Sequence, residues 1–145
     1  MTPEAPRNLV FLFVRWPEPG AVKTRLAKSV GDEKAANIYK SLAEETVRQL
    51  RPLQKDADWQ VLLYATPVQQ LGKIVLWLNE GERPVLDGMP QPDAPLAQRL
   101  EHARQWGFER LHADRIFLVG SDCPELTPRH LRDAARILRE KDAAL

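Results

Sequence analysis

Two hydrophobic patterns alternate along the 145-residue chain. Residues 8–14 form a nearly continuous apolar run rich in β-forming side chains, a pattern typical of a strand buried on both faces of a parallel sheet. Residues 32–50 place apolar side chains three and four positions apart, as in an amphipathic helix, and Pro52 follows the last of them. Between these segments, the loop 16–20 and a short helix that ends at Gly31 are expected.

The alternation continues through the second half of the chain. Further strands are predicted at 59–65, 83–87 and 115–120, and further helices at 68–78, 96–106 and from Thr127 and Pro128 onward. Pro84 favours an edge position for the strand at 83–87. Residues 88–95 contain three prolines and are predicted to form a loop. Strands that alternate with helices predict one α/β domain over residues 1–145, with a mostly parallel sheet.

Two details of the helices can be tested against a structure. Asp32 is expected to cap the helix at 32–50. The helix at 96–106 is expected to turn one face toward the core, formed by Leu96, Leu100, Ala103 and Gly107.

The composition of the chain disfavours two classes of function, nucleic-acid binding and membrane association. The 21 basic residues are spread along the chain and the net charge is +1, which does not favour nucleic-acid binding or a polybasic membrane segment. The apolar run at 9–14 is far too short to span a bilayer. A single cysteine, Cys123, excludes an internal disulfide and favours a reducing, cytoplasmic location. Its thiol is expected to be a packed small side chain rather than a nucleophile.

A candidate phosphate site follows the first strand. Gly20 allows a close approach of the backbone to a ligand, and Lys23, Thr24 and Arg25 stand where the next helix begins. Arg15, Lys23 and Arg25 offer positive charge to a diphosphate. A solvated basic helix start is the alternative that the residues alone leave open.

Two common phosphate motifs do not fit this segment. A Walker A loop requires glycine directly before the lysine and again five residues earlier, where this chain has Val22 and Pro17. The dinucleotide fingerprint requires three closely spaced glycines, and Gly20 is the one present.

A candidate cation site follows the strand at 115–120. Ligands of parallel sheets bind at the carboxyl ends of the strands, and Asp122 and Glu125 lie in the loop there. Mg²⁺ or Mn²⁺ commonly uses one or two carboxylates together with phosphate oxygens, and Asp122 is the better placed of the two. The alternative is that Ser121 and Asp122 satisfy turn amides. The three histidines show no metal-ligand spacing.

Both segments resemble signatures of one family. Residues 13–26, Phe-Val-Arg-Trp-Pro-Glu-Pro-Gly-Ala-Val-Lys-Thr-Arg-Leu, and residues 119–128, Val-Gly-Ser-Asp-Cys-Pro-Glu-Leu-Thr-Pro, are similar to the bacterial DUF2064 glycosyltransferase-like proteins. The resemblance implies a Rossmann-like GT-A nucleotide-diphospho-sugar transferase fold with sheet order 3-2-1-4. It places Lys23 and Arg25 on phosphate-contacting positions and Asp122 on the metal-binding position, and implies a nucleotide-sugar or nucleotide ligand.

The sequence departs from the family pattern in three places. Arg15 stands where the family usually has lysine. The segment 93–99 replaces a Gly-Asp-Leu-Gly-like loop, although Gln98 and Arg99 remain as possible substrate contacts. The family pattern also continues with a further strand and an acidic segment after the position of Leu145, so we expect a C-terminally short version of the fold.

These features leave three functional hypotheses. The first is a nucleotide-sugar-dependent glycosyltransferase, or a related nucleotidyltransferase, whose catalytic residues the sequence does not identify. The second is a truncated nucleotide-binding module without turnover, and the third is an interaction domain that keeps only the fold. Because the strand at 115–120 is expected at a sheet edge, with apolar side chains on both faces, we also predict a homodimer.

Overall fold

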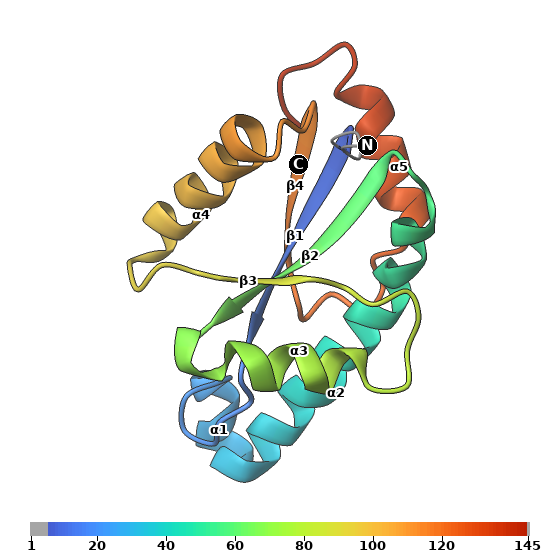
Figure 1. Cartoon of the computed structure of the whole chain (residues 1–145). Helices are drawn as coiled ribbons and strands as arrows, with labels where there is room; N and C mark the ends of the chain where they lie inside the picture. The colour runs from blue at the N-terminus through green and yellow to red at the C-terminus, as the bar shows by residue number, and fades with distance from the viewer. Residues whose placement is uncertain (1–5, 145) are drawn as a thin grey trace.

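The computed structural model describes residues 6–144 and confirms the predicted alternation of strands and helices (Figure 1). The strands are β1 (Asn8–Arg15), β2 (Trp59–Thr66), β3 (Gly88–Pro90) and β4 (Arg115–Gly120). The α-helices are α1 (Thr24–Val30), α2 (Asp32–Leu50), α3 (Leu71–Asn79), α4 (Leu96–Gln105) and α5 (Pro128–Ile137). Short 3-10 turns η1 (Arg51–Lys55) and η2 (Val68–Gln70) and a π-helical turn η3 (Trp106–Arg110) join them.

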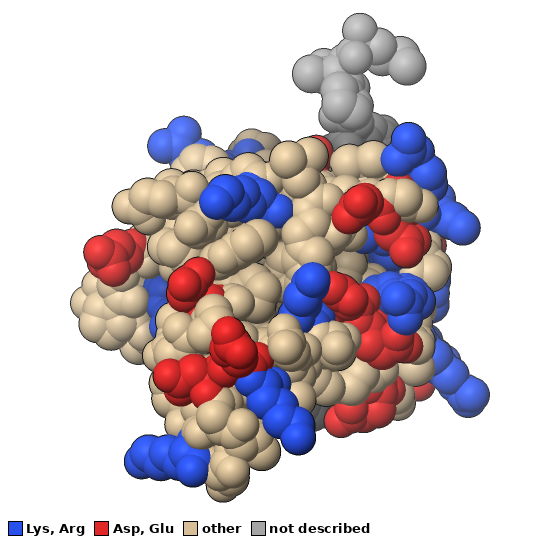
Figure 2. Space-filling view, turned by 90° about the horizontal axis from the view of Figure 1, so that it is seen from below, with Lys and Arg blue, Asp and Glu red and all other residues tan. Residues whose placement is uncertain are grey.

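The four strands form one parallel sheet in the order β3-β2-β1-β4, which confirms the predicted order 3-2-1-4. The carboxyl ends of all four strands therefore lie at the same edge. Figure 2 views the molecule from the side of that edge, and there positive and negative side chains are interspersed rather than gathered into one patch.

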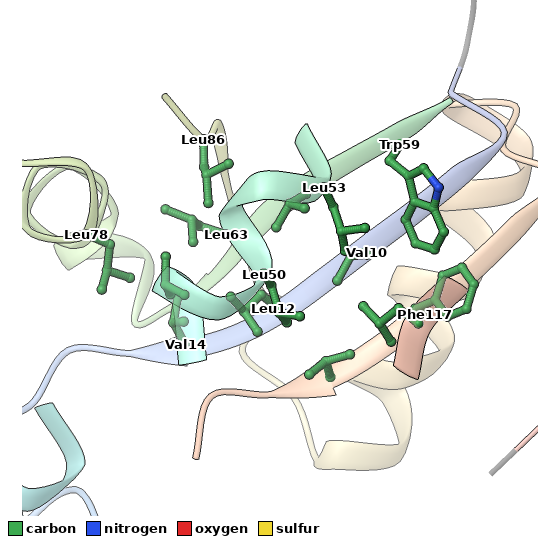
Figure 3. Close-up of a cluster of buried hydrophobic side chains, with 14 of the residues drawn as sticks. Val10, Leu12, Val14, Leu50, Leu53, Trp59, Leu63, Leu78, Leu86 and Phe117 are labelled. Atoms are coloured by element: carbon green, nitrogen blue, oxygen red, sulfur yellow. The ribbon is translucent and has the colours of Figure 1, made fainter. Parts of the chain in front are cut away.

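Strand β1 forms the centre of the sheet, because β2 and β4 pair with its two sides along most of its length. Its apolar residues alternate between two cores. Val10, Leu12 and Val14 face the core covered by α2, α3 and α5, much of which is visible in Figure 3. Leu9 and Phe11 face the opposite core, where Ala103 of α4 packs. This two-sided burial explains why the sequence shows a continuous apolar run here.

The third strand follows directly after the segment that the sequence predicted. Residues 83–87 form no strand, and β3 lies within the segment that was expected to be a loop. Side chains bond part of the backbone of 83–87: Asn79 bonds both the N–H and the carbonyl of Leu86, and Arg51 donates to Pro84 O. The expected edge position is correct, since β3 pairs only with β2.

Two expectations about helices were wrong. Gly31 occupies the N-cap of α2 and Asp32 is its first residue, where a carboxylate is favoured by the helix dipole rather than by a capping bond. Leu96 and Leu100 are exposed, whereas Ala103 and Gly107 are buried as predicted. Ala103 is the residue of α4 that joins the core cluster on this face, so the helix is buried near its end and not at its start. Within residues 6–144, no helix has the length and apolar character needed to cross a membrane.

Candidate functional site

The two candidate loops lie side by side because β1 and β4 are neighbours in a parallel sheet. Phe13 is in register with Gly120, so β1 reaches its last residue, Arg15, close to the point where β4 ends. The loop of residues 16–23, which we call the basic loop, follows β1, and the loop of residues 121–127, the acidic loop, follows β4. The topology thus brings together two segments about a hundred residues apart in sequence.

An ion pair joins these two loops. Lys23 Nζ donates to Asp122 Oδ2 at 2.5 Å, with the two side chains 29% and 45% exposed. The ammonium of Lys23 holds the pKa of the Asp122 carboxyl below its ordinary value. Because both groups are partly in water, the pair itself stabilises the fold by roughly 1 kcal/mol or less. Its main consequence is geometric, since it places a cation and a carboxylate at one point of the sheet edge.

The other residues predicted to bind phosphate lie on the basic loop or directly beside it: Arg15 ends β1, Gly20 lies within the loop, and Thr24 and Arg25 follow it. The Arg15 guanidinium donates to Ala21 O at 3.1 Å, which folds the loop back on itself. Gly20 has a φ of 87°, a conformation that glycine adopts without strain. Thr24 and Arg25 begin α1 and are exposed. Helix α1 has only seven residues, so the charge of this segment comes from side chains rather than from a long helix dipole.

Sequence reasoning missed a buried hydroxyl pair beneath the loops. Tyr39 of α2 accepts a hydrogen bond from the Arg15 amide at 2.9 Å, and its oxygen lies 2.7 Å from Ser121 Oγ. Both residues are buried, and burial raises the pKa of the Tyr39 phenol. The sequence offered one signal, a tyrosine within the apolar stripe of α2, which a packing role explains equally well.

The predicted substrate contacts belong to a second polar group. Arg99 donates from Nη1 to Gln91 Oε1 at 2.8 Å, and the buried Gln91 donates to Tyr64 O at 2.7 Å. These bonds tie Arg99 to the carboxyl end of β2 rather than to Lys23 or Asp122. Gln98, one residue earlier, is exposed. Gln91 was not identified from the sequence, because its position after β3 was predicted to be loop.

The acidic loop alone supplies too few ligands to hold a cation, so the remaining ligands have to come from a bound molecule. Among residues 6–144, no group of three or more His, Cys, Asp or Glu side chains is arranged to hold a metal ion. Asp122 offers one accessible carboxylate, which fits a Mg²⁺ or Mn²⁺ ion that takes most of its ligands from phosphate and water. The residues present therefore fit a cation that a diphosphate brings with it.

Cys123 lies next to Asp122 and is half-buried. Burial, together with the nearby carboxylates of Asp122 and Glu125, raises the pKa of its thiol. A thiol with a raised pKa is a weak nucleophile at neutral pH. These surroundings favour the packing role that the sequence suggested.

A separate cleft of about 280 Å³ opens between α2 and α3. No residue of either loop lines it, although Trp77 in its wall packs edge-on against Trp16 of the basic loop. Its lining includes Trp77 and equal numbers of basic and acidic side chains: Lys40, Arg48, Arg51, Glu44, Glu80 and Glu82. The Trp77 indole donates to Glu44, and Arg51 donates to the carbonyl of Leu78. Trp77 and Arg51 are thus held by bonds within the protein. Because α/β sheets bind ligands at their carboxyl edge, we place the candidate site there.

The sheet order, the covering helices and the charged loops at the carboxyl edge define an α/β domain of the nucleotide-diphospho-sugar transferase type of fold. A crystal structure from Desulfovibrio desulfuricans G20, described as a "putative nucleotide-diphospho-sugar transferase", superposes with a TM-score of 0.77 at 30% sequence identity. The match covers 93% of this chain and 55% of that one, so this chain spans little more than half the length of that relative.

The chain belongs to the DUF2064 family, described as "Uncharacterized protein conserved in bacteria", whose model matches residues 49–145. The matched segment includes Asp122 and does not include the basic loop. No curated protein matches the sequence.

Proposed function

We propose that the carboxyl edge of the sheet binds the diphosphate of a nucleotide sugar, and that the chain is the donor-binding part of a glycosyltransferase or a related nucleotidyltransferase. The observation that supports this most strongly is the Lys23–Asp122 ion pair, which joins the basic and acidic loops at the edge where α/β sheets bind ligands. The structural relative described as a "putative nucleotide-diphospho-sugar transferase" agrees with this ligand class.

Each charged group has a role in this proposal. Lys23 and Arg25 bind phosphate oxygens, and Arg15 adds positive charge on the same loop while its contact with Ala21 shapes the loop. Gly20 and Thr24 allow the loop backbone to approach the phosphates. Asp122 orients a divalent cation against the diphosphate, and Gln98 and Arg99 contact the sugar. The cation, when bound, supplies positive charge that stabilises a departing nucleoside diphosphate.

Ligand binding requires Lys23 and Asp122 to exchange partners. In the free protein each neutralises the other. A diphosphate with its cation offers both replacements at once, phosphate oxygens for Lys23 and the metal ion for Asp122. Since neither charge is left unpaired, the exchange avoids the cost of isolating a charge at a partly buried site.

A nucleotide-binding module without turnover is the second candidate. The Lys23–Asp122 ion pair supports diphosphate binding, and binding alone supports this module as well as the enzyme. Nucleotide binding without hydrolysis or transfer of a sugar donor would favour this module. Release of nucleoside diphosphate from the donor would favour the enzyme.

Lys23→Ala and Arg25→Ala test the binding proposal. Each variant should weaken binding of a nucleoside diphosphate, in the presence of Mg²⁺ or Mn²⁺, by about 1.5–3 kcal/mol, because each removes a charged hydrogen bond to phosphate. Isothermal titration calorimetry with UDP and GDP measures the change. Lys28→Ala is the matched control, since Lys28 is an exposed lysine near the end of the same short helix.

The control should bind as tightly as the wild type. Unchanged affinity in both Lys23→Ala and Arg25→Ala would remove the basic loop from the site. An equal loss in Lys28→Ala would indicate nonspecific attraction between anion and helix.

We also propose that the chain forms a homodimer through β4. This strand pairs with β1 on one side only, and Leu118 on its face is 40% exposed. An unpaired apolar strand edge readily pairs with another chain.

A further inference from the structure

The hydroxyl of Tyr39 connects both loops of the candidate site from below. Tyr39 lies on α2 and is 7% exposed. The amide of Arg15, the last residue of β1, donates to the phenol oxygen at 2.9 Å. The oxygen of Ser121, the first residue after β4, lies 2.7 Å from the same phenol oxygen. One side chain thus bonds the two strand ends from which the loops begin.

The Tyr39 oxygen joins two hydrogen bonds. The Arg15 amide can only donate, so the phenol oxygen accepts from it. Tyr39 and Ser121 share a second hydrogen bond, which either hydroxyl can donate. Burial raises the pKa of the phenol, so Tyr39 keeps its proton at neutral pH. The arrangement is a short chain of hydrogen bonds that joins Arg15, Tyr39 and Ser121.

The Tyr39 ring also packs against the basic loop itself. Val22, directly before Lys23, is 3% exposed and belongs to a small core cluster with Tyr39, Ala36 and Ala43 of α2. Tyr39 therefore reaches the end of β1, the basic loop beside Lys23, and the acidic loop beside Asp122.

Helix α2 is anchored in the core and can hold this contact in place, whereas α1 is not anchored in this way. Helix α2 has 19 residues, seven of them buried, and so is fixed by the core. Helix α1 has seven residues and none buried. The position of Lys23 thus depends on contacts that its own helix does not provide.

We infer that Tyr39 is the positioning residue of the nucleotide site, holding the basic and acidic loops so that Lys23 and Asp122 face the same ligand. It acts through the loops and does not touch the ligand. This inference rests on the proposed function, because it concerns the same site. It adds a residue that neither the family match nor the structural relative identifies.

Tyr39→Phe tests the inference because it removes the hydroxyl and keeps the ring. UDP or GDP binding with Mn²⁺ should weaken about tenfold, while thermal unfolding stays cooperative. Thr46→Val is the matched control: Thr46 is a fully buried hydroxyl on the same helix that bonds within the helix, to Leu42 O. Its removal should change nucleotide affinity less than twofold.

Ser121→Ala removes the other end of the chain of bonds. Ser121→Ala should weaken nucleotide binding to a similar extent. The Tyr39→Phe/Ser121→Ala double variant should bind nucleotide only slightly more weakly than either single variant, because the same linkage between the loops is broken in all three proteins. Additive losses would indicate two independent structural effects and would overturn the inference.

Hydrogen exchange in the free protein provides a readout that does not depend on a ligand. In Tyr39→Phe the Arg15 amide, which loses its acceptor, should exchange at least tenfold faster, and the amides of the acidic loop should also exchange faster. Unchanged exchange, or wild-type nucleotide affinity in Tyr39→Phe, would overturn the inference. A third outcome separates the two proposals: the wild type binds no nucleoside diphosphate, yet the amides of both loops exchange faster in Tyr39→Phe. This result would contradict the proposed function, whereas the role of Tyr39 in positioning the loops would stand.

Discussion

Lys23 has a backbone conformation that side-chain-bearing residues seldom adopt. Its φ of 49° and ψ of 46° lie in the left-handed region, directly before α1. For a non-glycine residue this conformation costs roughly 1–2 kcal/mol. The conformation coincides with the ion pair to Asp122, and residues held in this way are often found at ligand sites. A role in ligand binding would explain why Lys23 is held in this unfavourable backbone conformation.

Asp122→Asn tests the cation role of the acidic loop. The variant should lose the enhancement of nucleotide binding that Mg²⁺ or Mn²⁺ gives the wild type, because an amide is a much poorer ligand for these ions than a carboxylate. It should stay folded, since the Asp122 side chain is 45% exposed and its ion pair with Lys23 lies at the surface. Calorimetry with and without the cation, together with a thermal unfolding curve, measures both effects.

Asp114→Asn serves as the control for that variant, because Asp114 is an exposed aspartate in the turn before β4, at the opposite end of the strand. A wild type without any metal effect, combined with an Asp122→Asn variant that unfolds, would show that the carboxylate only supports its turn.

At the residue scale, the sequence predicted charged residues better than their contacts. Lys23 and Asp122 could be chosen because each follows a buried strand, but their pairing depends on the order of strands in the sheet. Tyr39 and Gln91 were missed, since a polar atom within a buried segment gives no sequence signal that separates a site from the core. Their partners, Ser121 and the carbonyl of Tyr64, come from distant parts of the chain.

At the element scale, the buried strands were the most predictable part of the molecule. β1 is a continuous apolar run because both of its faces are covered. The third strand was misplaced because Val85 and Leu86 resemble strand residues, while the bonds that decide the outcome come from Asn79 and Arg51 on other elements. Strand propensity could not reveal that these side chains bond to backbone groups of the segment.

Gly88, at the start of β3, provides a test of how tightly this strand packs. A methyl group at Gly88 would overlap the Val75 side chain of α3 and lie 3.2 Å from Leu71 Cδ1. Gly88→Ala should therefore lower the free energy of unfolding by about 1–3 kcal/mol, the usual cost of overpacking. Urea unfolding of the two proteins measures the difference.

Gly72→Ala is the control for this prediction, because Gly72 lies in α3 and has no atom within 4 Å of the added methyl group. It should stabilise the protein by about 0.5–1 kcal/mol through helix propensity. Equal stability of Gly88→Ala and the wild type would mean that β3 and α3 pack more loosely than the structure shows.

At the scale of the whole molecule, the two faces of the sheet differ in how they are covered. Helices α2, α3 and α5 pack on one face, whereas α4 and its following turn cover part of the other. Leu96, Leu100 and Leu118 are exposed on the less covered side. The sheet order followed from the family resemblance. The exposure of Leu96 and Leu100 could not be predicted, because apolar residues at helical spacing ordinarily indicate a buried face.

Self-association is the prediction that belongs to this scale. Multi-angle light scattering at high micromolar concentration should show a dimer for the wild type. Leu118→Glu should shift it to monomer, because a charge would be introduced on the β4 edge strand. Leu76→Glu, on α3, alters another highly exposed leucine and should leave the dimer intact. A monomeric wild type would show that the β4 edge is not an interface between copies.

Mapping the bound ligand tests the central claim most directly. Backbone amide chemical shifts, recorded while UDP or GDP is added with Mg²⁺, should change most at residues 15–25 and 120–125, the two loops joined by Lys23 and Asp122. Few changes are expected around Arg48 and Glu82, which line the cleft between α2 and α3 and belong to neither loop. Shifts concentrated in that cleft, or none at millimolar nucleotide, would contradict a diphosphate site at the carboxyl edge of the sheet.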